Sequence, residues 1–185
     1  DASLYLCWAT KGLGALRNSG TDFHRYFKTG ACVDFLLGGD PNADPARSKP
    51  AQGDLRLLLT YANGQPKAVL YQPVAAGAAP ADAWKTMTQA GGETSFARVV
   101  LLTDVKMAMA GDKDGYTLEA AVPLTALGLR PTPGMRLKMD WGILTTSDGN
   151  QVKQRAYWAN QLATGTSDEA IEARLEPHLW GYVGF

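Results

Sequence analysis

Metal-binding and thiol side chains are scarce in this sequence, which has two histidines and two cysteines among its 185 residues. A zinc site needs three or four nitrogen or sulfur ligands, whereas His24 and His178 stand 154 positions apart and neither lies in a cluster of such residues. This spacing argues against a zinc centre. Cys7 and Cys32 both lie in strand-like segments, and the sequence is consistent with either a disulfide between neighbouring strands or two buried free thiols.

Net charge is also absent, because 18 lysines and arginines balance 18 aspartates and glutamates. A neutral chain has no overall field that would attract nucleic acid or an anionic membrane surface. Nor does any apolar run approach the roughly 20 residues that a membrane-spanning helix requires. We therefore expect neither a nucleic-acid partner nor a membrane span.

Familiar catalytic motifs are missing as well. The sequence has no GxSxG, no Walker loop, no HExxH and no GxGxxG after a strand. Glycoside hydrolysis needs two acids that flank a cleft, and Asp34, Glu119 and Asp140 are the acids that fall within expected strands. Nothing in the sequence brings two of these acids face to face, so solvent-facing or turn-pairing roles are favoured. The sequence therefore predicts a protein that is not an enzyme.

What the chain does contain is a series of short apolar or alternating segments separated by turn signals. Asn63-Gly64 is the clearest of these signals, because this pair favours a two-residue hairpin turn. The Ala-rich segment 73–92 is consistent with either a short helix near 81–87, after Pro80, or an irregular excursion, and a single helical turn is expected at 124–127. Closely spaced strands with so little helix are typical of a β-sandwich. The expected strands are 4–9, 31–37, 54–61, 67–72, 95–109 as one strand or two, 116–122, 136–144, 154–158 and 179–184.

These features predict an all-β fold, namely an antiparallel β-sandwich of jelly-roll or immunoglobulin-like type with two sheets, long loops and at most short helices. The length fits a single domain, 1–185. Because strand-like residues begin almost at Asp1, we expect this domain to be a fragment of a larger secreted protein. In segment 136–144, Trp141 lies on the apolar face and is expected in the core, whereas Lys138 and Asp140 lie on the other face.

The long loop 38–53 carries oxygen-bearing side chains at short spacing. Asp40, Asn42 and Asp44 lie within it, and Asp54 follows it directly. Oxygen ligands of this kind bind calcium, and a structural calcium ion is one interpretation. The spacing is not that of an EF-hand, and Asp and Asn also favour turns for purely local reasons. Both interpretations are consistent with the sequence.

Aromatic residues give the clearest signal for a ligand. Of the five tryptophans, Trp158 differs from the others because it sits in the polar stretch 154–161. Sugars present C–H-rich faces that stack on aromatic rings, and their hydroxyls need planar polar partners, which Arg155 and Asn160 would supply. Packing of Trp158 at a sheet edge is the alternative. Further candidates for a stacking ring, each following a loop, are Tyr26, Phe27 and Trp84.

Two segments in the second half of the chain carry a family resemblance. Residues 115–129 read GYTLEAAVPLTALGL, and residues 133–140 read PGMRLKMD. This strand, turn and strand resemble the family 9 carbohydrate-binding modules and their relatives. The final strands of that family are similar to 155–158 and 176–183, while the likeness is weak over 41–92.

The resemblance implies a β-sandwich that binds sugar ends between two aromatic rings and is usually attached to a secreted enzyme. One ring would be Trp158, and the other would be Tyr26 or Phe27, just before the second main strand. The acid on that strand would be Asp34, where family members often have Glu. The expected protein is thus a non-catalytic module that binds a polysaccharide or oligosaccharide. Its expected location is secreted, periplasmic or at the cell surface, fused to other domains.

Two other functions fit the same fold. Haem-binding relatives, the DOMON-like cytochrome domains, hold a b-type haem between two side chains, often Met with His or Lys. The second alternative is a structural or interaction domain of an extracellular protein that binds no small ligand. The residues that would serve a haem are Met107, Met109, His24 and His178.

Overall fold

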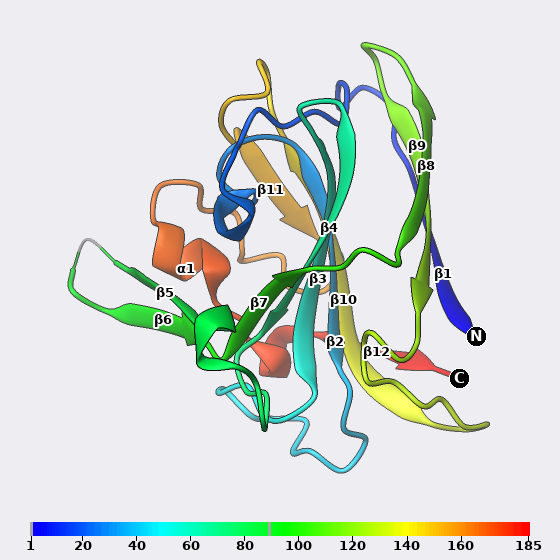
Figure 1. Ribbon diagram of the computed structural model, residues 1–185, viewed down its shortest axis with the longest axis vertical. Helices are drawn as coiled ribbons and strands as arrows, with labels where there is room; N and C mark the ends of the chain where they lie inside the picture. Colours follow the sequence, from blue (N-terminus) through cyan, green and yellow to red (C-terminus); the bar gives the residue numbers. More distant parts are fainter. Residues whose placement is uncertain (1, 89) are drawn as a thin grey trace.

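The computed structural model describes residues 2–88 and 90–185 (Figure 1). Within these residues the largest sheet has seven strands in the order β11-β10-β2-β3-β4-β7, and β12 also pairs with β10. All of its pairings are antiparallel. Its strands are β2 (Cys32–Gly38), β3 (Asp54–Ala62), β4 (Gln65–Gln72), β7 (Arg98–Leu101), β10 (Arg136–Thr145), β11 (Gln154–Tyr157) and β12 (Gly181–Gly184).

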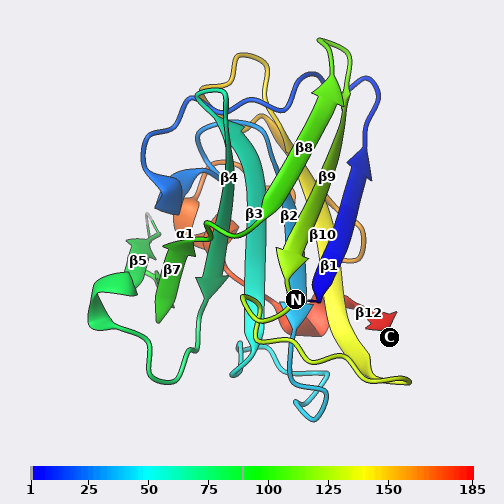
Figure 2. The ribbon, with the colours of Figure 1, turned by 45° about the vertical axis from the view of Figure 1, so that its right-hand side comes forward.

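A three-stranded sheet, in the order β1-β9-β8, faces one side of the large sheet (Figure 2). Along β9, buried and less buried positions alternate, as expected for a strand with one face on a core. Leu118 and Val122 of β9 share a core cluster with Val33 and Phe35 of β2. This arrangement confirms the predicted antiparallel β-sandwich. The strands of the second sheet are β1 (Ser3–Ala9), β8 (Lys106–Gly111) and β9 (Tyr116–Pro123).

The opposite face of the large sheet is covered by a third layer, which the sequence analysis does not predict (Figure 1). Every residue of β2 is therefore buried. Strands covered on both faces read as continuous apolar runs rather than alternating ones, and Leu57-Leu58-Leu59 of β3 is such a run. The third layer contains the helix α1 (Glu169–Ala173), the hairpin of β5 (Trp84–Met87) and β6 (Glu93–Phe96), and the 3₁₀ turn Phe23–Arg25.

The predictions for individual segments are confirmed in one case and differ from the structure in two others. The hairpin at Asn63-Gly64 is confirmed, because both residues adopt positive φ angles, 51° and 76°, between β3 and β4. Of the two alternatives for 73–92, the short helix near 81–87 is wrong: a 3₁₀ turn at Pro80–Asp82 leads into strand β5. Segment 95–109 is divided among three strands, β6, β7 and β8, rather than one or two.

The helix α1 escapes prediction because five residues are too few to display a helical period. Its start is fixed by Asp168, whose carboxylate accepts hydrogen bonds from the backbone N–H groups of Ala170 and Ile171. A further 3₁₀ turn, Pro177–Leu179, leads from this region into β12. Among the described residues, no helix is long and apolar enough to cross a bilayer.

Cys7 and Cys32 are both free thiols, so the disulfide alternative is wrong. The two residues lie in different sheets, Cys7 exposed on β1 and Cys32 fully buried on β2. The expectation of two buried thiols therefore holds for Cys32 alone. Burial raises the pKa of the Cys32 thiol well above its usual range, which keeps it protonated and unreactive.

We therefore expect a thiol reagent such as DTNB to modify one cysteine in the folded chain and two after denaturation. The reactive residue is Cys7, because its thiol is exposed while Cys32 lies within the core. A Cys7→Ser variant serves as the control and is expected to show no fast reaction until it is unfolded. Modification of both cysteines at equal rates in the folded protein would contradict this assignment.

The apolar face of strand β10 meets the core as expected, except at Trp141, and polar residues of its other face are buried instead of exposed. Trp141 is 40% exposed, so its placement in the core is wrong, and it lies 6.2 Å from Trp8 between ring centroids at an open edge of the sandwich. Lys138 and Asp140 are buried, because the third layer covers the face that was expected to meet solvent. The Lys138 ammonium donates to the backbone carbonyl of Trp180.

Candidate functional site

Two hollows adjoin the edge of the large sheet formed by β10 and β11. Alternate residues of β11 point to opposite faces of the sheet, so Ala156 lines one hollow and Arg155 the other. We call the first the aromatic cleft and the second the polar pocket. Tyr157, at the end of β11, borders both.

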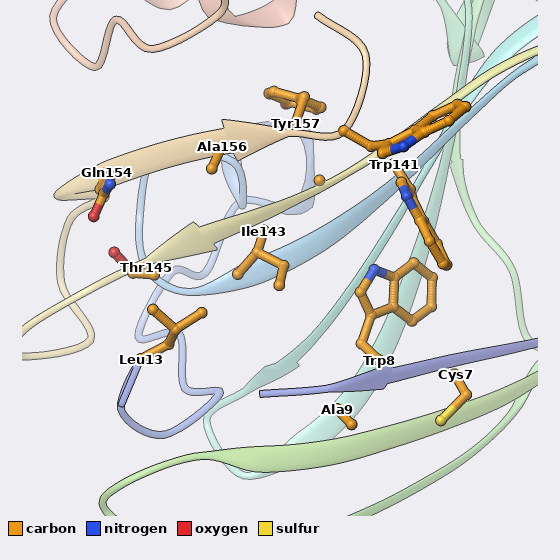
Figure 3. Close-up of a pocket in the computed structure, with 12 residues that line it drawn as sticks. Cys7, Trp8, Ala9, Leu13, Trp141, Ile143, Thr145, Gln154, Ala156 and Tyr157 are labelled. Carbon is orange, nitrogen blue, oxygen red and sulfur yellow. The ribbon is translucent and has the colours of Figure 1, made fainter. Parts of the chain in front are cut away.

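The aromatic cleft has a volume of about 340 Å³ and opens between β1 and the strands β10 and β11 (Figure 3). Thr145 and Gln154 lie toward one end of it and the rings of Trp8 and Trp141 toward the other. None of its lining side chains is charged. They are Cys7, Trp8, Ala9, Leu13, Trp141, Gly142, Ile143, Thr145, Gln154, Ala156, Tyr157 and Trp158.

Trp158 is 52% exposed at the rim of this cleft. Its backbone N–H donates to the backbone carbonyl of Trp141 at 2.9 Å, so the main chains of the two tryptophans lie side by side. The ring of Trp158 lies against Gly181, where any side chain would collide with it. Gly181 therefore lets the Trp158 ring rest on β12, next to Trp180 of the polar pocket.

The polar pocket has a volume of about 190 Å³ and lies under α1, on the face of the large sheet that the third layer covers. Four of its polar or charged side chains are at least nine-tenths buried: Arg56 at 2% exposure, Arg155 at 5%, Asn160 at 8% and Glu172 at 1%. Its full lining is Leu36, Arg56, Arg155, Tyr157, Asn160, Leu162, Ala163, Gly165, Ile171, Glu172, Arg174, Glu176, Leu179 and Trp180.

A buried ion pair forms the base of the polar pocket. Arg56 Nε donates to Asp34 Oδ1 at 2.9 Å and Nη2 donates to Oδ2 at 2.7 Å, a two-pronged contact. The Tyr157 hydroxyl donates to the same carboxylate at 2.6 Å. Burial alone would lower the pKa of Arg56, but the Asp34 carboxylate outweighs burial and raises it. The guanidinium also lies 4.9 Å from the centre of the Phe27 ring.

Arg155 occupies the wall of the pocket, and all of its hydrogen bonds go to neutral acceptors. Nη2 donates to the Tyr157 hydroxyl at 2.8 Å and to the backbone carbonyl of Glu172 at 2.9 Å. Nη1 makes a long contact of 3.4 Å with the carbonyl of Gly165. The Glu172 carbonyl also accepts from Arg56 Nη1 at 3.3 Å, so the two guanidinium groups lie close together.

Three atoms in this pocket are buried without a hydrogen-bond partner: Arg155 Nε, Asn160 Oδ1 and Glu172 Oε2. Among the described residues the Tyr116 hydroxyl is the one other buried side-chain oxygen or nitrogen in this state. Buried polar groups in native proteins are nearly always paired, because an unpaired one costs about 1–3 kcal/mol. The clustering of three such atoms around one hollow marks it as a place where a polar ligand would complete the hydrogen bonds.

The surrounding chain holds these side chains in place. Asp140 accepts hydrogen bonds from the backbone N–H groups of Ala159 and Asn160, both at 2.8 Å, which anchors Asn160 at the pocket wall. Burial raises the pKa of Asp140, and these backbone hydrogen bonds oppose the rise. Glu172 Oε1 accepts from Lys28 Nζ at 2.7 Å, so one carboxylate oxygen is engaged while the other is not.

The residues singled out in the sequence divide among three places. Arg155 and Asn160 line the polar pocket, and Asp34 lies beneath it with 0% exposure. Trp158 borders the aromatic cleft, where it is joined by Trp8 and Trp141. The remaining aromatics, Tyr26, Phe27 and Trp84, belong to or pack on the core cluster of the third layer.

These three core aromatics are therefore not positioned opposite Trp158. Phe27 is 0% exposed and Tyr26 is 5% exposed, so neither ring has an open face for a sugar. Trp84 stacks on Phe96 with 5.9 Å between ring centroids. Sequence reasoning overlooked Arg56 and Glu172 as pocket residues. A charged residue inside an apolar strand was the available signal for Arg56, because such a charge needs a buried partner.

The calcium interpretation of the long loop is not supported. Asp40 and Asp44 accept backbone N–H groups two residues further along, as in ordinary turns. Asp54 is buried and paired with Arg47. Across residues 2–88 and 90–185, no group of three or more His, Cys, Asp or Glu side chains converges as a metal site would require. Asn42 is part of the Asp40 turn.

The residues considered for a haem are likewise dispersed. Met107 and Met109 lie on β8 of the three-stranded sheet, whereas His24 lies in the third layer, stacked on Phe23. The large sheet separates these two layers (Figure 1). His178 lies in the 3₁₀ turn before β12 and is exposed. Nothing in this arrangement brings two axial ligands to one cavity.

Comparison with known proteins finds similarity to solved structures only. No protein-family model matches the sequence, and no curated protein matches it. The chain is similar to the solved structure of a family 9 carbohydrate-binding module (CBM9) from Caldicellulosiruptor kristjanssonii in complex with glucose. That match has 14% identity and a TM-score of 0.51, over 100% of this chain and 71% of that chain. It confirms the CBM9-like fold expected from 115–129 and 133–140.

A second solved structure, of a protein from Bacteroides uniformis described as carbohydrate-binding, is also similar. Its identity is 13% and its TM-score 0.37, over 98% of this chain and 70% of that chain.

Proposed function

We propose that this chain, which has a CBM9-like fold, is a non-catalytic module that binds the end of a saccharide in the polar pocket. The observation that carries the proposal is the set of three buried, unpartnered polar atoms on Arg155, Asn160 and Glu172. Sugar hydroxyls both donate and accept hydrogen bonds, and they would satisfy all three atoms. Asn160 Oδ1 and Glu172 Oε2 would accept, and Arg155 Nε would donate.

The lining of the pocket suits a sugar ring in two further ways. The side chains of Arg56, Arg155 and Glu172 are already held by hydrogen bonds, so ordering them on binding would cost little side-chain entropy. Its apolar members, among them Leu36, Leu179 and the ring of Trp180, would face the C–H groups of the sugar. Asp34 would act indirectly, because it holds Arg56 and the Tyr157 hydroxyl in place.

Trp158 is the proposed second contact. Its exposed ring lies beside the pocket, against Gly181, and would stack a neighbouring sugar unit together with Trp141. Two exposed tryptophans on one uncharged cleft favour the C–H-rich face of a carbohydrate over a charged ligand. In this proposal the polar pocket supplies orientation and the aromatic cleft supplies additional contact area.

A binding role also suits the acids of the pocket. Asp34 is paired with Arg56, and Glu172 is paired with Lys28. Carboxylates held in ion pairs are poor proton donors and acceptors, whereas glycoside hydrolysis needs one acid that gives up a proton. We further propose that the module is secreted and serves a larger protein, by attaching it to a polysaccharide.

The test is titration calorimetry of the chain against a panel of mono- and oligosaccharides. We expect Asn160→Ala to weaken binding about 5-fold, because one buried hydrogen bond is worth about 1 kcal/mol and 1.4 kcal/mol corresponds to a factor of about ten. Trp158→Ala is expected to weaken the binding of oligosaccharides more than the binding of monosaccharides. Tyr5→Ala removes an aromatic ring that is 79% exposed on β1 and should leave affinity unchanged.

Two results would count against the proposal. Absence of binding to every saccharide at millimolar concentration would refute it altogether. Loss of monosaccharide binding in Trp158→Ala, with full binding in Asn160→Ala, would move the site from the polar pocket to the aromatic cleft. Circular dichroism of each variant establishes that the fold is retained.

A further inference from the structure

Arg155 is a buried positive charge without an acidic partner. Its side chain is 5% exposed, and it takes part in none of the ion pairs formed among residues 2–88 and 90–185. Its acceptors are the Tyr157 hydroxyl and two backbone carbonyls, and Nε has none. Buried charges in proteins are normally paired, because desolvation of an isolated charge is costly.

The other charges around the pocket do not compensate Arg155. Asp34 is engaged by Arg56 in a two-pronged contact, and Glu172 is engaged by Lys28. Asp140, on the neighbouring strand β10, satisfies its carboxylate with three backbone N–H groups. Of the two remaining charged residues of the lining, Arg174 is exposed and Glu176 is half-buried.

Arg56 places a second guanidinium group close to Arg155. Arg56 and Arg155 both donate to the backbone carbonyl of Glu172, so two guanidinium groups share one neutral acceptor. Among the described residues, Asp34 is the one carboxylate in contact with Arg56 or, through the Tyr157 hydroxyl, with Arg155, so positive charge is in excess immediately around Arg155 even though Glu172 and Glu176 also line the pocket. An anionic group on a ligand would be stabilised there more than a neutral one.

We propose that the saccharide bound by this pocket is acidic, with a uronic acid at the end that enters. This inference rests on the proposed function and specifies its ligand class. The uronate carboxylate would accept a hydrogen bond from Arg155 Nε, the edge of the guanidinium that lacks a partner. The ring hydroxyls would donate to Asn160 Oδ1 and Glu172 Oε2. A ligand with one anionic acceptor and two hydroxyl donors matches the three unpartnered atoms one to one.

The experiment compares ligands that differ only in charge. Titration calorimetry measures Kd for glucuronic acid, for its methyl ester and for glucose, and for the galacturonic acid and galactose set. We expect one uronic acid to bind at least 10-fold tighter than its ester and its neutral sugar, and this preference to shrink as salt is added. Arg155→Gln is expected to remove the preference, while Arg155→Lys retains part of it.

Each outcome decides a separate point. Equal affinity for acid, ester and neutral sugar would overturn the acidic-ligand inference and leave saccharide binding intact. No binding by any of these sugars or their oligomers would overturn both. Competition by sodium acetate as strong as that by the uronic acid would reduce the pocket to a general anion site and overturn the saccharide assignment. The ester comparison uses the unaltered chain, so it remains decisive even where an Arg155 variant fails to fold.

Discussion

Replacing Asp34 with alanine is expected to lower the free energy of unfolding by about 3–5 kcal/mol, the range for breaking a buried ion pair from one side. Asp34 is 0% exposed and Arg56 2%, so the variant would leave a guanidinium in the protein interior without its anion. It would also remove the acceptor of the Tyr157 hydroxyl. Chemical denaturation followed by fluorescence measures the change.

Two further variants test whether the loss of stability in Asp34→Ala comes from the buried charge that is left unpaired. In Asp34→Leu combined with Arg56→Met, both charges are removed, and most of the lost stability should return because apolar replacements of similar size are tolerated at such sites. Lys85→Ala breaks an ion pair whose partners, Lys85 and Glu93, are 69% and 42% exposed, and it should change stability by less than about 1 kcal/mol. A loss below about 1 kcal/mol in Asp34→Ala would show that the pair carries little of the core's stability.

The same ion pair illustrates what sequence reasoning reached and what it missed. Local rules identified most strands of the two sheets, because alternation along 116–122 and the Asn63-Gly64 turn are properties of neighbouring residues. The third layer depends on contacts between segments far apart, such as Arg56 with the carbonyl of Glu172, 116 positions away. No local period encodes that contact. The prediction of Trp141 as a core residue fails for the same reason, since β1 is an edge strand of the second sheet and the aromatic cleft opens beside it.

Sequence reasoning identified individual residues of the candidate site but not how they are grouped. Arg155 and Asn160 were identified because planar polar side chains next to a tryptophan suggest a sugar site, and both line one pocket. Their grouping with Trp158 overlooked the alternation of strand β11, which directs Arg155 to the face opposite Ala156. Residues adjacent in a strand can therefore belong to different sites, because their side chains point to opposite faces of the sheet.

The second large effect is expected at Asp140, which is 0% exposed and lies outside both hollows. Its Oδ1 accepts from the N–H groups of Trp141 and Ala159, and its Oδ2 accepts from that of Asn160. Asp140→Ala removes all three hydrogen bonds. At about 1 kcal/mol each, the free energy of unfolding should fall by about 3 kcal/mol. Denaturant titration measures this loss.

Asp140 also couples stability to binding, because it ties β10 to the segment that carries Asn160. In Asp140→Ala this segment loses its anchor, so saccharide affinity should fall by about as much as in Asn160→Ala, although Asp140 does not line the pocket. Asp140→Asn is the matched control. Its amide oxygen can keep the two bonds made by Oδ1, while the N–H of Asn160 loses its acceptor, so stability should fall by only about 1–2 kcal/mol. Unchanged saccharide affinity in a folded Asp140→Ala protein would show that Asn160 is held by other contacts, and the polar pocket would then be rigid without this carboxylate.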